Sequence, residues 1–252
     1  MSFRSTPALL TLCLLCSPAD EALADMAAFA VESGEEKVAV LELYTSEGCS
    51  SCPPADRWLS RLKDDPRLWK QIVPVAFHVD YWNYLGWRDR FADARFSNRQ
   101  GEYQQHDYLQ TAYTPGVMKN GREWRGWPNG DIPLSRHEDQ AGILKITIGD
   151  DKASAEFIPA HRGLSRLMLN LALLGFHLST HVAAGENAGK TLRHDFVVLD
   201  FQQFTQASQG GRFRWTLPGL LKSARQDTSA IALWVTAVDD PTPLQATGGW
   251  LK

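Results

Sequence analysis

The sequence predicts an α/β fold in which a mixed first half is followed by a small β-rich domain. Between residues 38 and 79, an apolar run, a segment of helical period and a second apolar run follow one another, which is the order of a parallel β-α-β unit. An Asn-Gly pair between two short strand-like runs indicates a hairpin near residue 120. Beyond residue 142, strand-like runs alternate with turn residues, as in a small β-sandwich. We therefore expect domains at 37–141 and 142–252.

The composition is that of an ordinary globular protein. Of 252 residues, 44% are hydrophobic and 22% are charged, with a formal net charge of −3. The absence of a basic stripe argues against nucleic-acid binding. The sequence contains no Gly-rich phosphate loop, no His-Glu-x-x-His and no nucleophile elbow. Nucleotide-binding and hydrolase functions are therefore weak candidates, and we expect no cofactor.

Residues 1–24 predict a secretory signal peptide. Arg4 precedes a short apolar run, and Ala22-Leu23-Ala24 fits the small-x-small pattern for cleavage before Asp25. The apolar run is too short to span a bilayer. We expect a periplasmic or secreted protein that has no membrane span after cleavage and begins with a flexible lead-in over 25–36.

Cleavage would leave two of the four cysteines, Cys49 and Cys52, because Cys13 and Cys16 lie in the signal peptide. In an exported protein, two cysteines at this spacing can close one tight disulfide. Such a small ring restrains the unfolded chain very little. Chemistry is therefore a better explanation for the pair than stability.

The predicted strand at 38–44 leads through a polar turn to Cys49 and then to a helix with apolar residues at helical spacing. Pro53 and Pro54 suit the first helical turn, where a missing N–H breaks no helix bond. A cysteine at a helix N-terminus lies near free N–H groups and the positive end of the helix dipole. Both favour the thiolate, which is the nucleophile of disulfide exchange.

The second predicted strand, 72–79, leads into an aromatic loop. Asp80, Tyr81, Trp82 and Trp87 follow the end of this strand, where sites form in open α/β sheets. We expect these four side chains to line a groove for polypeptide. A loop folded onto its own aromatic side chains is an equal alternative.

The remaining elements follow from periodicity and turn signals. Helices are predicted within 91–108 and over 131–141, and Thr114–Pro115, ahead of the hairpin, is a candidate cis peptide bond. The strand-like runs of the second half are 144–148, 153–158, 166–180, 191–201, 212–217 and 231–238. Residues 166–176 also fit a helical period.

A Cys-x-x-Cys after the first strand, with a Thr-Pro ahead of a hairpin, resembles the thioredoxin fold. The stretches 42–56, 78–87 and 113–115 more closely resemble an exported family, the domain-of-unknown-function 1223 family, and 185–192 is a weaker match. The resemblance implies a thioredoxin-like first domain. It also implies that Pro115 is cis, shapes the substrate groove beside the disulfide and keeps metals off the sulfurs. It implies no substrate.

Residues and resemblance together predict an exported thiol–disulfide oxidoreductase. Cys49 would attack the disulfide of a protein or small-thiol substrate, and Cys52 would resolve the mixed disulfide. Thr114 and Pro115 would border the dithiol. Glu42 would accept the proton of Cys52 if its strand bulges, because in a regular strand it faces the other way. A redox partner, not identified by the sequence, would complete the cycle.

Two alternatives stay open. In a non-catalytic binding protein, the same fold would serve as a scaffold, and the aromatic loop and the β-rich half would hold a ligand. In a metal carrier, the two thiolates would bind Cu(I) or zinc with His78 as a third ligand, although His78 is more simply a core histidine. His177 and His181 have ligand-like spacing, but they lack an evident Cys or carboxylate partner. We therefore expect no metal site.

Overall fold

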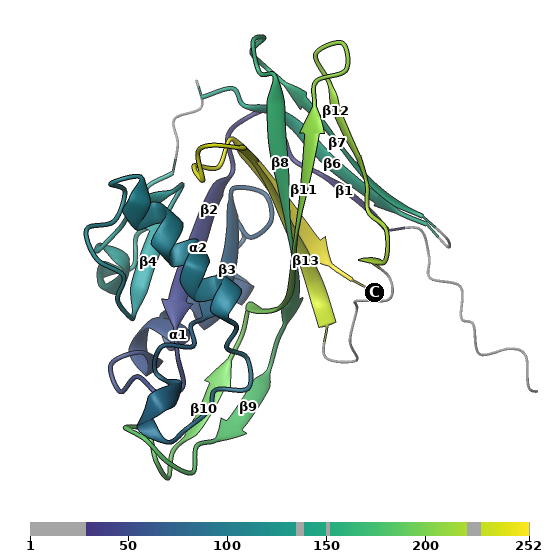
Figure 1. Cartoon of the computed structure of the whole chain (residues 1–252). Coiled ribbons are helices and arrows are strands. Elements are labelled where there is room, and N and C mark those ends of the chain that lie inside the picture. Colours follow the sequence, from purple (N-terminus) through teal and green to yellow (C-terminus); the bar gives the residue numbers. More distant parts are fainter. Residues whose placement is uncertain (1–28, 135–138, 150–151, 221–227, 252) are drawn as a thin grey trace, which may run out of the picture.

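The computed structural model describes residues 29–134, 139–149, 152–220 and 228–251 (Figure 1). The expected signal peptide and its cleavage site lie outside these ranges. None of the described helices is long and apolar enough to cross a membrane.

One large mixed sheet organises the fold. Its eight strands have the order β14-β13-β8-β11-β3-β2-β4-β5. Their bounds are β2 Ala39–Thr45, β3 Ile72–His78, β4 Gly116–Lys119, β5 Arg122–Glu123, β8 Arg166–Gly175, β11 Val197–Ala207, β13 Thr228–Ala237 and β14 Gln245–Trp250.

The other elements are shorter. A four-stranded sheet, β1-β6-β7-β12, consists of β1 Phe29–Glu32, β6 Gly142–Ile148, β7 Ala153–Pro159 and β12 Phe213–Thr216. A hairpin pairs β9 Leu178–His181 with β10 Thr191–His194. The helices are α1 Pro53–Ser60 and α2 Ala94–Gln105, with 3-10 turns at η1 Arg61–Asp64, η2 Asn83–Leu85 and η3 Trp127–Asn129.

The predicted parallel β-α-β unit is formed by β2, α1 and β3. β2 and β3 pair in parallel in a regular register, for example Leu43 with Ala76, and every residue of both strands is buried. Near-continuous apolar runs suit strands that are covered on both faces. The apolar stripe of α1, which includes Trp58 and Leu59, is buried as well. This packing fixes the point at which the cysteine turn leaves the sheet.

The large sheet continues through the predicted boundary at residue 141. β11 pairs with β3 in parallel at Val197–Ala76 and runs antiparallel to β8 over its whole length. Successive residues of β8 face opposite sides. Leu171 and Leu173 join the core under the four-stranded sheet, whereas Ala172 and Leu174 join the core of the first half. The sandwich therefore shares one sheet with the β-α-β unit.

The strand expected from residue 166 is confirmed over Arg166–Gly175, and the helical alternative is not formed, because each face of β8 meets a different core. Two other expectations are corrected. The helix expected over 131–141 is not formed in the described parts, 131–134 and 139–141, and 135–138 lie outside them. Pro133 disfavours a helical conformation at Ile132, whose side chain is buried. In the lead-in, Phe29–Glu32 form β1 against β6.

Candidate functional site

Cys49 and Cys52 form a disulfide between the end of β2 and the start of α1, with their Cα atoms 5.5 Å apart. The turn is shaped locally, because the Cys49 N–H donates to the Ser46 carbonyl at 3.2 Å and the Cys52 N–H donates to the Cys49 carbonyl at 3.3 Å. Cys52 is the N-cap of α1. Both cysteines are 0% exposed. A partner thiol can therefore reach a sulfur only after a covering group moves.

Trp82 links the cysteine turn to the Thr114–Pro115 bond, which is cis as the sequence predicts. Its indole N–H donates to the Thr114 hydroxyl at 2.8 Å. A Cβ placed on Gly48 would lie 3.0 Å from the Trp82 Cβ, so only glycine fits here without displacing Trp82. The aromatic loop and the cis bond are therefore brought together at the cysteine turn.

The four residues expected to line a groove lie in different surroundings. The Trp87 indole N–H donates to Glu47 Oε2 at 2.8 Å, so Trp87 also contacts the cysteine turn. The Tyr81 hydroxyl donates to Gln100 Oε1 at 3.0 Å. Asp80 instead accepts a hydrogen bond from Ser97 of α2. Trp82 and Trp87 are therefore the two groove candidates that touch the cysteine turn.

Glu42 lies in a buried ion pair. Arg99 approaches its two carboxylate oxygens at 2.7 and 2.9 Å. The hydroxyls of Tyr103 and Tyr44 donate to the same carboxylate at 2.6 and 2.8 Å. β2 runs without a bulge, and no hydrogen bond joins Glu42 to Cys52, both of which are described residues. These contacts support a structural role for Glu42 rather than the expected proton transfer.

A second buried polar cluster lies beside the cysteine turn. The Asp89 carboxylate accepts from the Glu47 N–H at 2.9 Å and contacts His78 Nδ1 at 2.7 Å. His194, at the end of β10, lies with its ring centroid 4.9 Å from that of His78. The Asp56 carboxylate, in the first turn of α1, accepts from the Thr45 hydroxyl at 3.1 Å. The ends of β3 and β10 and the start of α1 thus bring acidic and imidazole side chains together next to the cysteine turn.

Burial and charge shift the protonation of this cluster. Burial raises the pKa of Asp56 above its usual value. Burial alone would lower the pKa of His78, but the Asp89 carboxylate outweighs it, so the pKa of His78 is raised. Burial likewise opposes ionisation of Asp89, yet His78 and the backbone donors leave the pKa of Asp89 lowered. His78 and Asp89 therefore favour their charged forms.

Several atoms of this cluster lack a hydrogen-bond partner among the described residues. They are Glu47 Oε1, His78 Nε2 and both ring nitrogens of His194. His194 Nε2 lies 3.4 Å from Glu47 Oε1, but without hydrogen-bond geometry. Buried polar groups without partners are uncommon and call for an explanation. Here they belong to a carboxylate and two imidazoles, and the carboxylate is that of Glu47, two residues before Cys49.

The β9–β10 hairpin completes the surroundings of the cysteine turn from the second half of the chain (Figure 1). The buried Asn187 side chain donates to the carbonyl oxygens of both Glu47 and Cys49 at 2.9 Å. The neighbouring Glu186 carboxylate accepts from the Ser50 N–H at 3.0 Å. Sequence reasoning missed both residues. The one available signal was the weak family match over 185–192.

The described residues contain no group of three or more His, Cys, Asp or Glu side chains arranged to hold a metal ion. His78, the suggested third ligand, contacts Asp89 instead. His177 and His181 are exposed on the β9–β10 hairpin and the turn before it. Neither arrangement favours the metal-carrier alternative.

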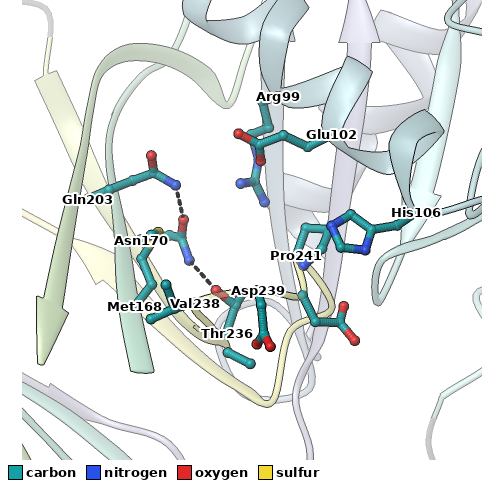
Figure 2. A pocket seen from close by; sticks show the side chains of 12 residues that line it. Arg99, Glu102, His106, Met168, Asn170, Gln203, Thr236, Val238, Asp239 and Pro241 are labelled. Carbon is teal, nitrogen blue, oxygen red and sulfur yellow. Dashed lines mark hydrogen bonds between the residues drawn. The ribbon is translucent and has the colours of Figure 1, made fainter. Parts of the chain in front are cut away.

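A separate polar cavity of about 250 Å³ lies between α2 and the strands β8, β11 and β13 (Figure 2). Asn170 lies within it and accepts from the Gln203 amide at 2.8 Å. Arg99, already paired with Glu42, and Glu102 both line it from α2. No cysteine lines this cavity. It is therefore distinct from the dithiol.

Comparisons with known proteins agree with this fold. A family model described as "Protein of unknown function (DUF1223)" matches residues 40–236. A crystal structure of a structural-genomics target from Agrobacterium tumefaciens is 24% identical, with a TM-score of 0.63 over 85% of this chain and 95% of that one. HBP35 of Porphyromonas gingivalis is 18% identical, with a TM-score of 0.58 over 87% and 76%. No curated protein matches the sequence. At these identities the two structures concern the fold alone.

Proposed function

Since the chain belongs to the DUF1223 family of proteins of unknown function, we propose its activity from its own geometry: it is an exported thiol–disulfide oxidoreductase with a thioredoxin-like first half. The observation that carries this proposal is the placement of the Cys49–Cys52 disulfide. It lies between a central strand and the helix that follows, and Trp82 ties its turn to the cis Thr114–Pro115 bond. Strand, Cys-x-x-Cys and helix are the layout of a redox site.

The proposed reaction is a two-step exchange. In the reduced protein, the Cys49 thiolate attacks one sulfur of a substrate disulfide, and the other substrate sulfur leaves as a thiolate. The Cys52 thiolate then attacks the Cys49 sulfur, releasing the second substrate thiol and closing the Cys49–Cys52 bond. The substrate gains two electrons and two protons, and the protein loses them. A dithiol partner returns the protein to its reduced state.

The buried acid and imidazole cluster would handle the proton of Cys52. Asp56 is the nearest of these groups along the chain, and its backbone N–H donates to the Cys52 carbonyl at 3.1 Å. Its raised pKa allows it to take up a proton more readily than an ordinary carboxylate. Glu47 and His194 lie next in the cluster and offer further unpartnered atoms.

Substrate access requires a local opening, because the disulfide is buried. Trp82 rests against Gly48, next to Cys49, so the loop 80–87 is the element whose movement would expose the sulfurs. Trp82 and Trp87 would then border the substrate, a disulfide-bearing protein or small thiol. We place the reaction in the periplasm or outside the cell, where disulfides persist.

The same burial favours one alternative, a non-catalytic binding protein with an inert disulfide. Cys52→Ser and Cys49→Ser distinguish the two functions. In an exchange enzyme, C52S accumulates a mixed disulfide with a labelled peptide disulfide through Cys49, whereas C49S does not. If folded C52S forms no adduct, the exchange function fails and the binding alternative takes its place.

A further inference from the structure

The Cys49 sulfur lies at a helix N-terminus that offers few hydrogen-bond donors. Thiolates at such positions are normally stabilised by the free N–H groups of the first turn, which lowers the thiol pKa. Fewer donors destabilise the thiolate and therefore the reduced form of the pair. The donors available over residues 50–56 can be counted, because the structure describes all of them.

Most of these donors are missing or already used. Pro53 and Pro54 have no N–H. The N–H groups of Ala55 and Asp56 donate to the Cys52 carbonyl at 2.9 and 3.1 Å. The Cys52 N–H donates to Cys49 O. What is left near the sulfur comes from Ser51, whose hydroxyl lies 3.4 Å from Cys49 Sγ.

Two backbone N–H groups of this stretch remain, those of Ser50 and Ser51, and Glu186 takes the one from Ser50. The Glu186 carboxylate accepts from it at 3.0 Å. Hydrogen bonds from the Ser50 side chain and backbone lower the pKa of Glu186, so this carboxylate is ionised at neutral pH. The β9–β10 hairpin thus places a negative charge one residue from Cys49 and occupies the backbone donor next to Cys49 in the sequence.

We propose that Glu186, on the β9–β10 hairpin, makes the reduction potential of the Cys49–Cys52 pair more negative. This protein therefore donates electrons to substrate disulfides rather than oxidising substrate thiols. This inference rests on the proposed exchange function. Reducing the Cys49–Cys52 bond creates a thiolate at Cys49. The Glu186 carboxylate, hydrogen-bonded to the next residue, disfavours that thiolate by charge repulsion, which favours the disulfide form. A pair that prefers its disulfide form is the stronger electron donor when reduced.

Electrons and protons balance when the protein reduces a substrate disulfide. Each turnover moves two electrons and two protons from the Cys49 and Cys52 thiols to a substrate disulfide, which becomes two thiols. The protein then carries the Cys49–Cys52 disulfide. A dithiol donor of the compartment must supply two electrons and two protons to reopen it, and the donor itself becomes a disulfide.

The test compares Glu186→Gln with the unaltered protein. Gln keeps an acceptor for the Ser50 N–H and removes the charge. Each protein is equilibrated with reduced and oxidised dithiothreitol, and its thiols are trapped by alkylation and counted by mass. For an exposed charge we expect the equilibrium constant for reduction to rise roughly two- to fivefold, equivalent to about 10–20 mV. The Cys49 pKa, followed by thiolate absorbance, should fall.

Glu32→Gln is the matched control. It removes the same charge from an exposed carboxylate on β1, well separated from the hairpin (Figure 1). It should leave the equilibrium constant unchanged. Pro53→Ala adds an N–H at the first position of α1 and should shift the equilibrium in the same direction as E186Q.

The outcomes separate the two proposals. If C52S traps substrate but E186Q leaves both the equilibrium constant and the Cys49 pKa unchanged, the exchange function stands and this inference is overturned. If reduced unaltered protein fails to reduce glutathione disulfide while its oxidised form readily oxidises glutathione, the proposed direction is wrong. If C52S forms no adduct, the exchange function itself fails.

Discussion

Asn187 and Cys49 are 138 residues apart in the sequence, yet the Asn187 side-chain amide donates to the Cys49 carbonyl at 2.9 Å. The same nitrogen also donates to Glu47 O. The second half of the chain therefore holds the cysteine turn directly. It supplies a positioning side chain, a carboxylate and an imidazole to the surroundings of the disulfide.

Replacing Asn187 should loosen the cysteine turn. Asn187→Ala leaves two carbonyl oxygens without their donor in a buried place, which costs about 1–3 kcal/mol. The free energy of unfolding of the oxidised protein, measured by denaturant titration, should fall by that amount. Asn98→Ala, at an exposed position on α2, should change it little. An equal loss in both variants would contradict the proposed role of Asn187.

Removing one partner of the buried Glu42–Arg99 ion pair should destabilise the protein. Arg99→Met leaves the Glu42 carboxylate charged, buried and without its cation, and should lower the free energy of unfolding by about 3–5 kcal/mol. Adding Glu42→Gln removes the stranded charge while keeping an acceptor for the two tyrosine hydroxyls. The double variant should regain much of the loss. A double variant less stable than R99M would contradict this account.

The His78–Asp89 contact should make stability depend on pH. The pKa of His78 is raised in the folded protein, so its contribution is fully present below pH 6.5, the ordinary value, and is lost as the pH rises through the raised value. The charged groups that face it are Asp89, Asp56 and Glu47. The free energy of unfolding should therefore fall above pH 6.5.

The variant that tests this pH dependence is His78→Gln, in which that fall should be absent. His161→Gln, at an exposed histidine, should retain it. On the acid side, the lowered pKa of Asp89 gives a contribution that is present above pH 3.8 and lost as the pH falls through the lowered value. A flat profile between pH 6.5 and 9 in the unaltered protein would contradict the assignment.

Trp82 should limit access to the disulfide. Trp82→Ala removes the hydrogen bond to Thr114 and the contact with Gly48, which together hold the loop over the cysteine turn. If these two contacts stabilise the closed loop by about 1–1.5 kcal/mol, the second-order rate constant for reduction of the disulfide by dithiothreitol should rise roughly five- to tenfold. Tyr84→Ala, on the same loop but 79% exposed, is the control. An unchanged rate in W82A would show that another element covers the sulfurs.

The core of the first half was predictable because its signals are local. β2 and β3 are covered on both faces and therefore read as uninterrupted apolar runs. The Asn120–Gly121 hairpin and the cis Thr114–Pro115 bond depend on residues that are adjacent in the sequence. The cysteine pair was found in the same way, from its own spacing.

The rest depends on contacts that span the chain. Glu42 could not be assigned from its own strand, because its partner Arg99 lies on α2, 57 residues away. β14 was not predicted because Gly248 and Gly249 lie within it, and glycine disfavours strands. Gly248 is needed there because a side chain would collide with the Trp69 ring. The hydrogen-bond donors and acceptors around the cysteine turn come from the β9–β10 hairpin, far along the sequence. No local sequence pattern indicates these contacts.

The reduction potential of the Cys49–Cys52 pair tests the central claim most directly. The protein is equilibrated in dithiothreitol or glutathione buffers, its thiols are alkylated, and the added mass is counted. We predict a clean two-electron midpoint between about −270 and −200 mV, the range of working reductants and exchange enzymes. A pair that never closes, or that stays oxidised far below about −300 mV as structural disulfides do, would contradict the exchange function.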